Sequence, residues 1–418
     1  MPTRSRHSGH LALVVCHPAR TGGMETFCKF LTETVLEAGW QVTVALSGEN
    51  IYDSLQTWYG DAIRVVPVEW LDATCAGDRE YERTRILERR CWFARVQPDV
   101  ALCVQSSNTP FRAAIVGARL AGVPVISTHR TMAWPVEYVP SRRHFFGLVP
   151  GLGLHRRKVI FKTWLTAFLA ARVVYNSTVV ARGYETLYHY PRHRRVVIPN
   201  AVRFSPALSA SRASDRPVTI GYAGRIGADK RLDILLRAVA AMQSRNVRVQ
   251  IYGEGAEQPL LADLASRLGI ADRVAWRGVT QDSASAYADM DIVVLCSPRE
   301  SSSNMVLEAM AAGKAVVATD AGGMPELIEP GVGGLCVPPL DVSALAAALD
   351  KLAADADLRR RLGQNARVKA LREHDPRCVA EQWMALLNSV AGRPSSVRDI
   401  ACPEVYGVSP TAPGGLMT

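Results

Sequence analysis

Residues 292–312 read IVVLCSPRESSSNMVLEAMAA and decide the fold class of this chain. The apolar run 292–296 predicts a buried β-strand, and residues 305–312 have the composition of a helix. A short polar turn joins the two. A helix that follows a parallel strand in this way presents free backbone amides at the carboxyl edge of the sheet, where α/β proteins bind ligands. The stretch therefore predicts a parallel α/β fold with an anion-binding helix start.

Two carboxylates, Glu300 and Glu308, flank this turn. A carboxylate repels the phosphates that the helix start attracts, so its natural partners are hydroxyl groups, such as those of a ribose and a sugar. Acidic residues near a helix start are also common for purely structural reasons, and the pair alone does not decide between the two interpretations. The residues of the helix start expected to bind the donor are Ser303, Asn304, Met305 and Val306, the first three through their backbone amides.

Apolar, β-rich runs alternate with helical patterns before and after this stretch. Strands are predicted at residues 11–16, 41–46, 63–66, 99–104, 123–127, 172–175 and 195–198, and again at 218–223, 247–252, 273–276, 292–295 and 315–318. Helical patterns such as 24–38 and 78–95 lie between them. These repeated βα units predict buried parallel sheets with helices on both faces.

The alternation stops at residues 204–217, where Ser, Ala, Pro and charged residues predict a linker. We therefore expect two Rossmann-like, doubly wound domains that face each other across a cleft, residues 1–203 and 218–375. The last helix, 376–391, is expected to pack back onto the first domain. The tail 392–418 is too rich in Pro, Gly and Ser for order to be expected.

The composition of the 418 residues narrows the class of protein further. Nine cysteines are scattered and form no Cys-x-x-Cys pair, which argues against a disulfide framework and a zinc site and favours a reducing cytoplasm. Because the sequence has no run of about 18 uncharged apolar residues, we expect no membrane-spanning helix.

Each expected domain opens with a glycine-containing loop directly after its first strand. In the first loop, Gly22 and Gly23 leave room for a bulky anionic group beside the backbone. In the second, Gly224 is followed by Arg225 and Lys230. Two cations beside a helix start suit a diphosphate better than a single phosphate. Solvated surface cations are the alternative interpretation, and glycine spacing by itself is a weak signal.

Positive charge concentrates between residues 130 and 203. This segment holds thirteen Arg or Lys against two Glu, a balance of +11, although the whole chain carries only +10. Within it, an apolar run at 145–154, with the Pro and Gly content of a loop or broken helix, lies between basic clusters, as on surfaces that anionic bilayers attract. A solvated basic face is the alternative. The residues expected to contact a membrane or an anionic acceptor are Arg142, Arg143, Phe145, Phe146, Arg156, Arg157 and Lys158.

Taken together, these motifs resemble the retaining GT-B-fold glycosyltransferases, in particular glycosyltransferase family 4 (glycosyl transferases group 1). The resemblance is strongest over residues 218–340 and weaker over 11–200. It implies transfer of a sugar from a nucleoside diphosphate, with UDP favoured and GDP an alternative, to an acceptor hydroxyl with retention of anomeric configuration. The implied acceptor is a lipid-linked or cell-surface glycan precursor in polysaccharide biosynthesis, met by a cytoplasmic enzyme at the inner face of the membrane.

The resemblance also implies roles for single residues. Arg225 and Lys230 would hold the diphosphate. Glu308 would bind the ribose hydroxyls, and Glu300 would bind the transferred sugar near its reacting face. His129 matches a position from which a family histidine often reaches the donor sugar, with a simple polar contact as the alternative. Other positions that match family landmarks are Gly23, Asn200, Gly253, Gly255, Arg277, Gly278, Gly322, Gly323 and Glu326.

Three features depart from the family pattern. Ser301 and Ser302 replace the usual Gly and aromatic residue after the first Glu, which leaves the sugar preference open. After Asn200, the usual Gly-Val-Asp is replaced by residues 201–203. The Asp-x-Asp at 289–291 has the spacing of metal-dependent transferases, but it runs into a strand and is expected to be a helix-to-strand junction. We therefore expect no metal and no other cofactor, because Lys and Arg would stabilise the leaving diphosphate.

Other classes of protein stay open on the sequence. A sugar-nucleotide epimerase of similar fold would use the same diphosphate site without an acceptor. A catalytically inactive nucleotide-binding scaffold is disfavoured by the intact Glu300, Arg225 and Lys230. A dinucleotide-dependent oxidoreductase is disfavoured because the first loop lacks Gly-x-Gly-x-x-Gly with an acid about 20 residues later. No nucleic-acid partner is expected.

Overall fold

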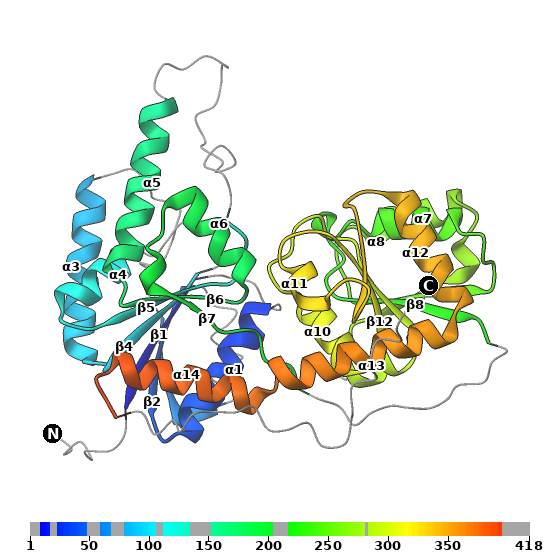
Figure 1. Cartoon of the computed structure of the whole chain (residues 1–418). Coiled ribbons are helices and arrows are strands. Elements are labelled where there is room, and N and C mark those ends of the chain that lie inside the picture. The colour runs from blue at the N-terminus through cyan, green and yellow to red at the C-terminus, as the bar shows by residue number, and fades with distance from the viewer. Residues whose placement is uncertain are drawn as a thin grey trace, which may run out of the picture.

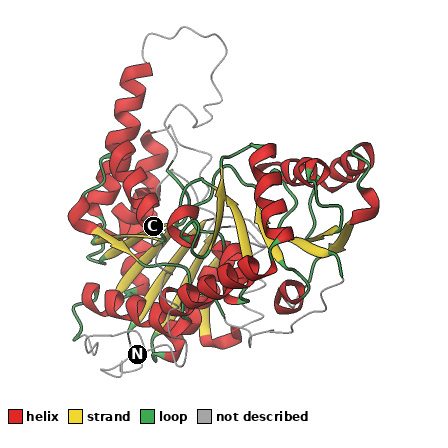
Figure 2. Ribbon diagram, turned by 45° about the vertical axis from the view of Figure 1, so that its right-hand side comes forward, coloured by secondary structure: helices red, strands yellow, loops and turns green. Residues whose placement is uncertain are grey.

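The computed structural model describes residues 9–16, 23–47, 59–67, 79–105, 112–133, 152–203, 216–280 and 283–394. These residues form two α/β domains that lie side by side, each built around its own parallel β-sheet (Figure 1). Helices cover the sheets (Figure 2), so the central strands, such as β4, β5, β11 and β12, are buried on both faces. Burial on both faces explains why these central strands appear in the sequence as continuous apolar runs rather than as alternating patterns.

The first sheet has seven parallel strands in the order β3-β2-β1-β4-β5-β6-β7. Its strands are β1 (His10–Cys16), β2 (Gln41–Ser47), β3 (Ile63–Pro67), β4 (Val100–Gln105), β5 (Val125–His129), β6 (Arg172–Tyr175) and β7 (Arg195–Val197). Its helices are α1 (Gly23–Glu37), α3 (Arg79–Val96), α4 (Arg112–Leu120), α5 (Leu152–Leu169) and α6 (Thr178–Tyr188).

The second sheet has six parallel strands in the order β10-β9-β8-β11-β12-β13. Its strands are β8 (Val218–Ala223), β9 (Val247–Tyr252), β10 (Val274–Gly278), β11 (Ile292–Leu295), β12 (Ala315–Thr319) and β13 (Gly334–Val337). Its helices are α7 (Leu232–Ala241), α8 (Gln258–Arg267), α9 (Ser283–Ala288), α10 (Asn304–Ala311), α11 (Met324–Ile328), α12 (Val342–Ala354) and α13 (Ala356–Glu373).

The strand order reverses once in each sheet, between β1 and β4 and between β8 and β11. At such a switch point, the loops after the two central strands diverge and leave a crevice at the carboxyl edge of the sheet. The predicted architecture of two doubly wound parallel sheets is thus confirmed.

The last two helices connect the domains. Helix α13 packs Ala366 and Ala370 into the core of the second domain, whereas α14 (Pro376–Val390) runs beneath the first domain beside α1 (Figure 1). Trp383 of α14 is fully buried, and its ring lies 5.4 Å from the ring of Phe27 in α1. Helix α14 therefore completes the same core to which β1 and α1 contribute.

Two segments differ from the expectation. The four-residue strand β13 is not in the predicted set, because its sequence, Gly-Leu-Cys-Val, is too short to show a period. The predicted loop or broken helix around 145–154 lies partly outside the described residues, but from Leu152 onward the chain is the regular helix α5. A single glycine, Gly153, costs a helix only about 1 kcal/mol, which the remaining good helix formers offset. No helix in the described ranges has the length and hydropathy needed to cross a bilayer.

Candidate active site between the two domains

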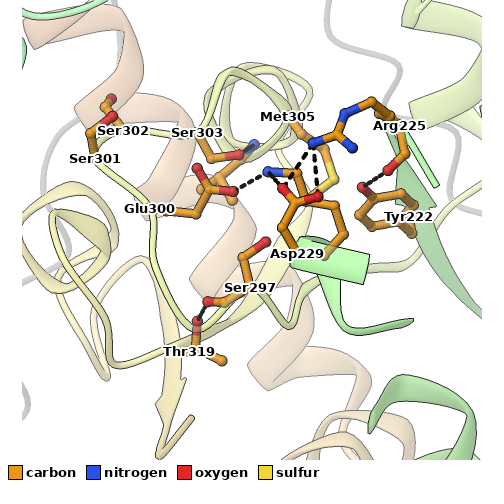
Figure 3. Close-up of polar contacts among 12 residues, drawn as sticks. Tyr222, Arg225, Asp229, Ser297, Glu300, Ser301, Ser302, Ser303, Met305 and Thr319 are labelled. Atoms are coloured by element: carbon orange, nitrogen blue, oxygen red, sulfur yellow. Dashed lines mark hydrogen bonds and ion pairs between the residues drawn. The ribbon is translucent and has the colours of Figure 1, made fainter. Parts of the chain in front are cut away.

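The site predicted from the sequence lies at the switch point of the second sheet. The loop after β8 carries Arg225, and the loop after β11 carries Glu300. Because β8 and β11 are neighbours and parallel, both loops leave the same edge of the sheet. Figure 3 shows Glu300, Asp229 and Arg225 gathered there above the end of the sheet.

Lys230 and Glu300 form an ion pair at the centre of this edge. The distance from Lys230 Nζ to Glu300 Oε1 is 2.5 Å, and the two side chains are only 22% and 15% exposed. Lys230 ends a single 3-10 turn, and the next residue, Arg231, has a left-handed φ of 51° that turns the chain into α7. This local geometry points the lysine back over the sheet edge.

Arg225 is more exposed and lies beside the pair. Its guanidinium donates to both carboxylate oxygens of Asp229, at 2.8 and 2.9 Å, while the hydroxyl of Tyr222 donates to the Arg225 carbonyl (Figure 3). Since both charged side chains are more than half exposed, solvent screens this pair and it contributes little to stability. Arg225 is therefore free to exchange its carboxylate partner for another anion.

Two glycines hold the backbone of Glu300. A Cβ atom on Gly322 would overlap the carbonyl oxygen of Glu300, and one on Gly323 would overlap that of Ser301. The Gly323 amide donates to the Glu300 carbonyl at 3.0 Å. Gly322 also has a φ of +59°, which residues with a side chain rarely adopt. The pair thus lets the loop after β12 pack directly on the Glu300 loop.

Helix α10 begins beside Glu300 as predicted. Ser303 is its N-cap, and the Ser303 hydroxyl accepts from the amide of Val306 at 3.4 Å. The amide of Val306 therefore has its partner within the start of the helix. The amides of Asn304 and Met305 lie in the first turn, where a helix supplies no acceptors of its own.

Glu308 lies one turn into α10 and is largely buried. Burial raises the pKa of Glu308, and the nearby Tyr287 hydroxyl partly opposes that shift. Within the described residues, no cation pairs with this carboxylate. A largely buried carboxylate without a cation accepts hydrogen bonds from hydroxyl groups readily.

The first domain approaches α10 at two points. Gly23, the first residue of α1, faces the side chain of Asn304, whose Nδ2 would lie 3.5 Å from a Cβ on that glycine. Asn200, at the connection between the domains, donates from Nδ2 to Asn304 Oδ1 at 2.8 Å. The sequence identified Asn200 as a family landmark, but it did not indicate that Asn304 is its partner.

Ser301 forms a further contact between the domains. Its hydroxyl donates to the carbonyl of Arg130 at 2.7 Å and lies 3.3 Å from Asn176 Nδ2. Sequence reasoning noted Ser301 only as a departure from the usual glycine. The structure gives the hydroxyl a function, because it ties the Glu300 loop to the end of β5.

Glu326 connects the domains on another side. Its two carboxylate oxygens accept from the amides of Thr178 and Val179, each at 3.1 Å, and so cap the start of α6 from the second domain. A cavity of about 330 Å³ lies beside this contact, with Pro199, His374 and Gln382 in its wall. The sequence marked Glu326 as a family landmark without indicating this partner.

His129 lies in the core of the first domain. Its side chain is 1% exposed and is surrounded by the rings of Tyr175, Tyr184 and Tyr190, with ring centroids 4.2 to 5.7 Å away. Burial lowers the pKa of His129 to about 3, so the imidazole is neutral at physiological pH. The expectation that it reaches a donor sugar is therefore corrected. The alternative, a polar contact, fits its Nε2 atom 3.4 Å from Ser127 Oγ.

The other predicted donor residues follow neighbouring strands. Gly253 follows β9 and donates from its amide to the carbonyl of Gly278 at 2.7 Å, while Arg277 is exposed at the end of β10. Gly224 and Gly255 lie in the loops after β8 and β9.

Of the residues predicted to contact a membrane or an anionic acceptor, Arg157 and Lys158 are exposed on α5. The predicted residues that lie outside the described part are Gly22, Arg142, Arg143, Phe145, Phe146 and the side chain of Arg156.

The Asp-x-Asp motif is structural. Helix α9 ends at Ala288 and β11 begins at Ile292, so residues 289–291 form the predicted helix-to-strand junction. Asp291 accepts from the amide of Thr219 at 2.8 Å and pairs with Arg216 at 2.5 Å. In the described ranges, no group of three or more His, Cys, Asp or Glu is placed to hold a metal ion.

Comparison with known families gives two matches. The model of glycosyl transferases group 1 matches residues 217–355, and that of glycosyltransferase family 4 matches residues 21–205. The D-inositol 3-phosphate glycosyltransferase of Saccharomonospora viridis is 35% identical over 272 residues, which cover 60% of this chain and 61% of that protein. The chain thus matches less than two thirds of the length of this relative.

Two solved structures have a similar fold. A glycosyltransferase from Rickettsia africae has a TM-score of 0.74 at 16% identity and covers 92% of this chain and 98% of its own. Anabaena HepE in complex with UDP has a TM-score of 0.71 at 20% identity, with coverage of 91% and 100%. At these identities the likeness concerns the fold alone, and it supports the architecture expected from the sequence.

Proposed function

This chain belongs to the glycosyltransferases of family 4 and group 1, and from that premise we propose that it moves a sugar from a nucleoside diphosphate to an acceptor hydroxyl with retention of configuration. The observation that carries the proposal is the Lys230–Glu300 ion pair beside the start of α10, opposite Gly23 of the other domain. The product would be a step in glycan or polysaccharide biosynthesis. UDP is the favoured carrier, since HepE, which has the same fold, binds UDP.

The ion pair gives a mechanism for donor binding. An incoming diphosphate competes with Glu300 for Lys230 and with Asp229 for Arg225, because a phosphate oxygen accepts the same hydrogen bonds and carries more charge. Once displaced, the Glu300 carboxylate accepts from a sugar hydroxyl. The amides of Asn304 and Met305 add positive potential at the phosphates.

The transfer itself exchanges one bond for another at the anomeric carbon. The bond from that carbon to the diphosphate oxygen breaks, a bond to the acceptor oxygen forms on the same face, and the acceptor proton passes to the leaving phosphate. Lys230 and Arg225 stabilise the charge that develops on the diphosphate, so we propose that no metal is required. Glu300 stabilises the oxocarbenium-like sugar and keeps it oriented.

The test is an assay with UDP-sugars and GDP-sugars, with and without EDTA, in which a glycosylated acceptor is detected and its anomeric configuration is measured. A product of retained configuration in the presence of EDTA is expected. Conversion of the donor sugar without any acceptor product would instead indicate an epimerase. Activity that EDTA abolishes and magnesium or manganese restores would contradict metal independence.

The two carboxylates should divide their roles. Glu308→Gln is expected to weaken nucleoside diphosphate binding, because Glu308 is buried in α10 without a cation and suits the ribose. Glu300→Gln should leave that affinity near normal and depress turnover, since Glu300 lies in the loop where the sugar reacts. Calorimetry with UDP and steady-state kinetics measure the two effects. Equal losses of diphosphate affinity in both variants would contradict this division.

We also propose that the first domain meets an anionic membrane through α5, where a lipid-linked acceptor would be found. Arg157 and Lys158 are exposed in its first turns, and Phe161 is 59% exposed and stacks on Trp164 with ring centroids 5.8 Å apart. Basic residues beside exposed aromatic rings are typical of surfaces that contact anionic bilayers.

A triple variant tests this membrane contact. Replacing Arg157, Lys158 and Phe161 by Ser should reduce flotation with phosphatidylglycerol vesicles, because each basic residue contributes about 1 kcal/mol and the aromatic ring adds a part that salt does not screen. The matched control is Leu260→Ser with Lys351→Ser, which are exposed in the second domain. A wild-type protein that does not float with these vesicles would rule out the contact.

A further inference from the structure

Arg130 is a buried cation with an unfilled hydrogen-bonding position. It follows β5 directly, and the residue is 9% exposed. The guanidinium lies 3.8 Å above the ring of Phe27, and Nη2 donates to the side-chain oxygen of Asn200. Nη1 is buried and has no hydrogen-bond partner, and no carboxylate in the described residues pairs with this arginine.

A buried arginine with an unpaired nitrogen destabilises the folded protein unless an anion or another acceptor binds it. A buried charge without a counter-ion loses its hydration, and a cation–π contact with one amide oxygen offsets only part of that loss. Burial lowers the pKa of Arg130 to about 9, which shows the same penalty on its charged form. Buried charges in folded proteins are normally paired, so the missing partner is expected to come from outside the chain.

Other unfilled polar atoms lie near the same edge. In the register of the first sheet, Gln105 of β4 pairs with His129 of β5, and His129 pairs with Tyr175 of β6. The carboxyl ends of these three strands therefore lie next to one another, and Arg130 follows the middle one. Buried side-chain atoms without a partner at these strand ends are Gln105 Oε1, Thr128 Oγ1, His129 Nδ1, Arg130 Nη1 and Asn176 Oδ1.

Arg130 also lies close to the reacting end of the site. Its carbonyl accepts from Ser301, the residue after Glu300, and its partner Asn200 bonds to Asn304 at the start of α10. Arg130 belongs to the first domain, whereas the two cations assigned to the donor diphosphate belong to the second. A ligand on Arg130 would therefore enter from the acceptor side.

We infer that Arg130 binds a phosphate group carried by the acceptor. The acceptor is thus a phosphate ester or a diphosphate, and this assignment rests on the proposed glycosyltransferase function. A phosphate supplies several acceptor oxygens and the negative charge that the Arg130 guanidinium lacks. A neutral sugar would leave the buried charge uncompensated.

Binding of inorganic phosphate tests this inference without any sugar transfer. Thermal shifts are measured against phosphate at constant ionic strength for the wild type, Lys230→Gln and Arg130→Gln, with Arg172→Gln as an exposed arginine control on β6. In Arg130→Gln, the apparent phosphate affinity should fall at least about tenfold, the scale of one charge-assisted hydrogen bond. Lys230→Gln should still show the part of the phosphate-induced thermal shift that is lost in Arg130→Gln. An Arg130→Gln variant that binds phosphate as tightly as the control overturns the inference.

A second variant covers the case in which Arg130→Gln does not fold. Asn200→Asp places a carboxylate where the Arg130 guanidinium already donates, so this internal counter-ion should compete with phosphate and also weaken its binding. Phosphate affinity equal to that of the wild type in Asn200→Asp would likewise overturn the inference.

The origin of the phosphate is distinguished with vesicles. Phosphatidylcholine vesicles containing phosphatidic acid should bind Arg130→Gln less tightly than the wild type if the phosphate is borne by a lipid. Equal vesicle binding, with a difference for inorganic phosphate alone, indicates a soluble phosphate ester. If the chain binds phosphate through Arg130 but yields no glycosylated product, only the proposed function fails. If it transfers sugar while Arg130→Gln binds phosphate normally, only this inference fails.

Discussion

Replacement of Lys230 by Ala should lower kcat/KM for sugar transfer by about 30- to 1000-fold, which corresponds to about 2–4 kcal/mol of transition-state stabilisation. The reason is position, because the Lys230 ammonium lies 2.5 Å from Glu300 and is mostly shielded from solvent. A cation fixed in advance beside the leaving diphosphate needs no reorganisation when charge develops there. Arg225→Ala should fall in the same range, since this guanidinium faces the same edge.

The measurement is kcat/KM with the preferred nucleotide sugar, accompanied by thermal unfolding of each variant. Lys351→Ala, which removes an exposed lysine of α12, is the matched control and should retain full activity. The thermal midpoints of the Lys230 and Arg225 variants should stay close to that of the wild type, so that the loss is one of chemistry. Transfer at the wild-type rate by either variant would show that the diphosphate lies elsewhere.

Replacement of Trp383 by Ala should destabilise the first domain by about 3–5 kcal/mol, the range for removing a large aromatic side chain from a core. Trp383 is fully buried, although it belongs to α14 at the far end of the chain, and it packs with Phe27 and the residues around it. The cavity that the indole would leave is enclosed by α1 and the first sheet, which cannot collapse around it cheaply.

Urea unfolding followed by circular dichroism measures this loss, with Glu381→Ala, an exposed neighbour on α14, as the control for helix propensity. Two domains need not unfold together, so the transition of the first domain has to be followed separately from that of the second. A loss below about 1 kcal/mol would mean that α14 does not complete the core of the first domain.

Much of this fold follows from local patterns. The boundaries of β8, β9 and β11 match the predicted residues 218–223, 247–252 and 292–295, because these strands are apolar runs bounded by polar turns. The start of α10 could also be predicted, since Ser303 is a strong N-cap residue directly before a helical pattern. Apolar runs and helix caps depend on a few neighbouring residues, so they can be recognised directly in the sequence.

The sequence also indicated the chemistry of the central residues. Lys230 and Glu300 were both placed in loops at the carboxyl ends of parallel strands, and the structure brings them into contact. Their separation of 70 residues is bridged by the strand order, in which β8 lies next to β11. The order of strands follows from packing across the whole domain, so the sequence did not indicate the contact between Lys230 and Glu300.

Burial and long-range partners were decided by the tertiary structure alone. The sequence around His129 does not indicate whether this residue faces a cleft or is buried among tyrosine rings. Nor does it indicate that the Ser301 hydroxyl bonds to the carbonyl of Arg130. Trp383 enters a core that begins more than 340 residues earlier, at α1 and β1. The physical reason is that local sequence sets backbone preference over a few residues, whereas the environment of a side chain depends on which distant segments share its space.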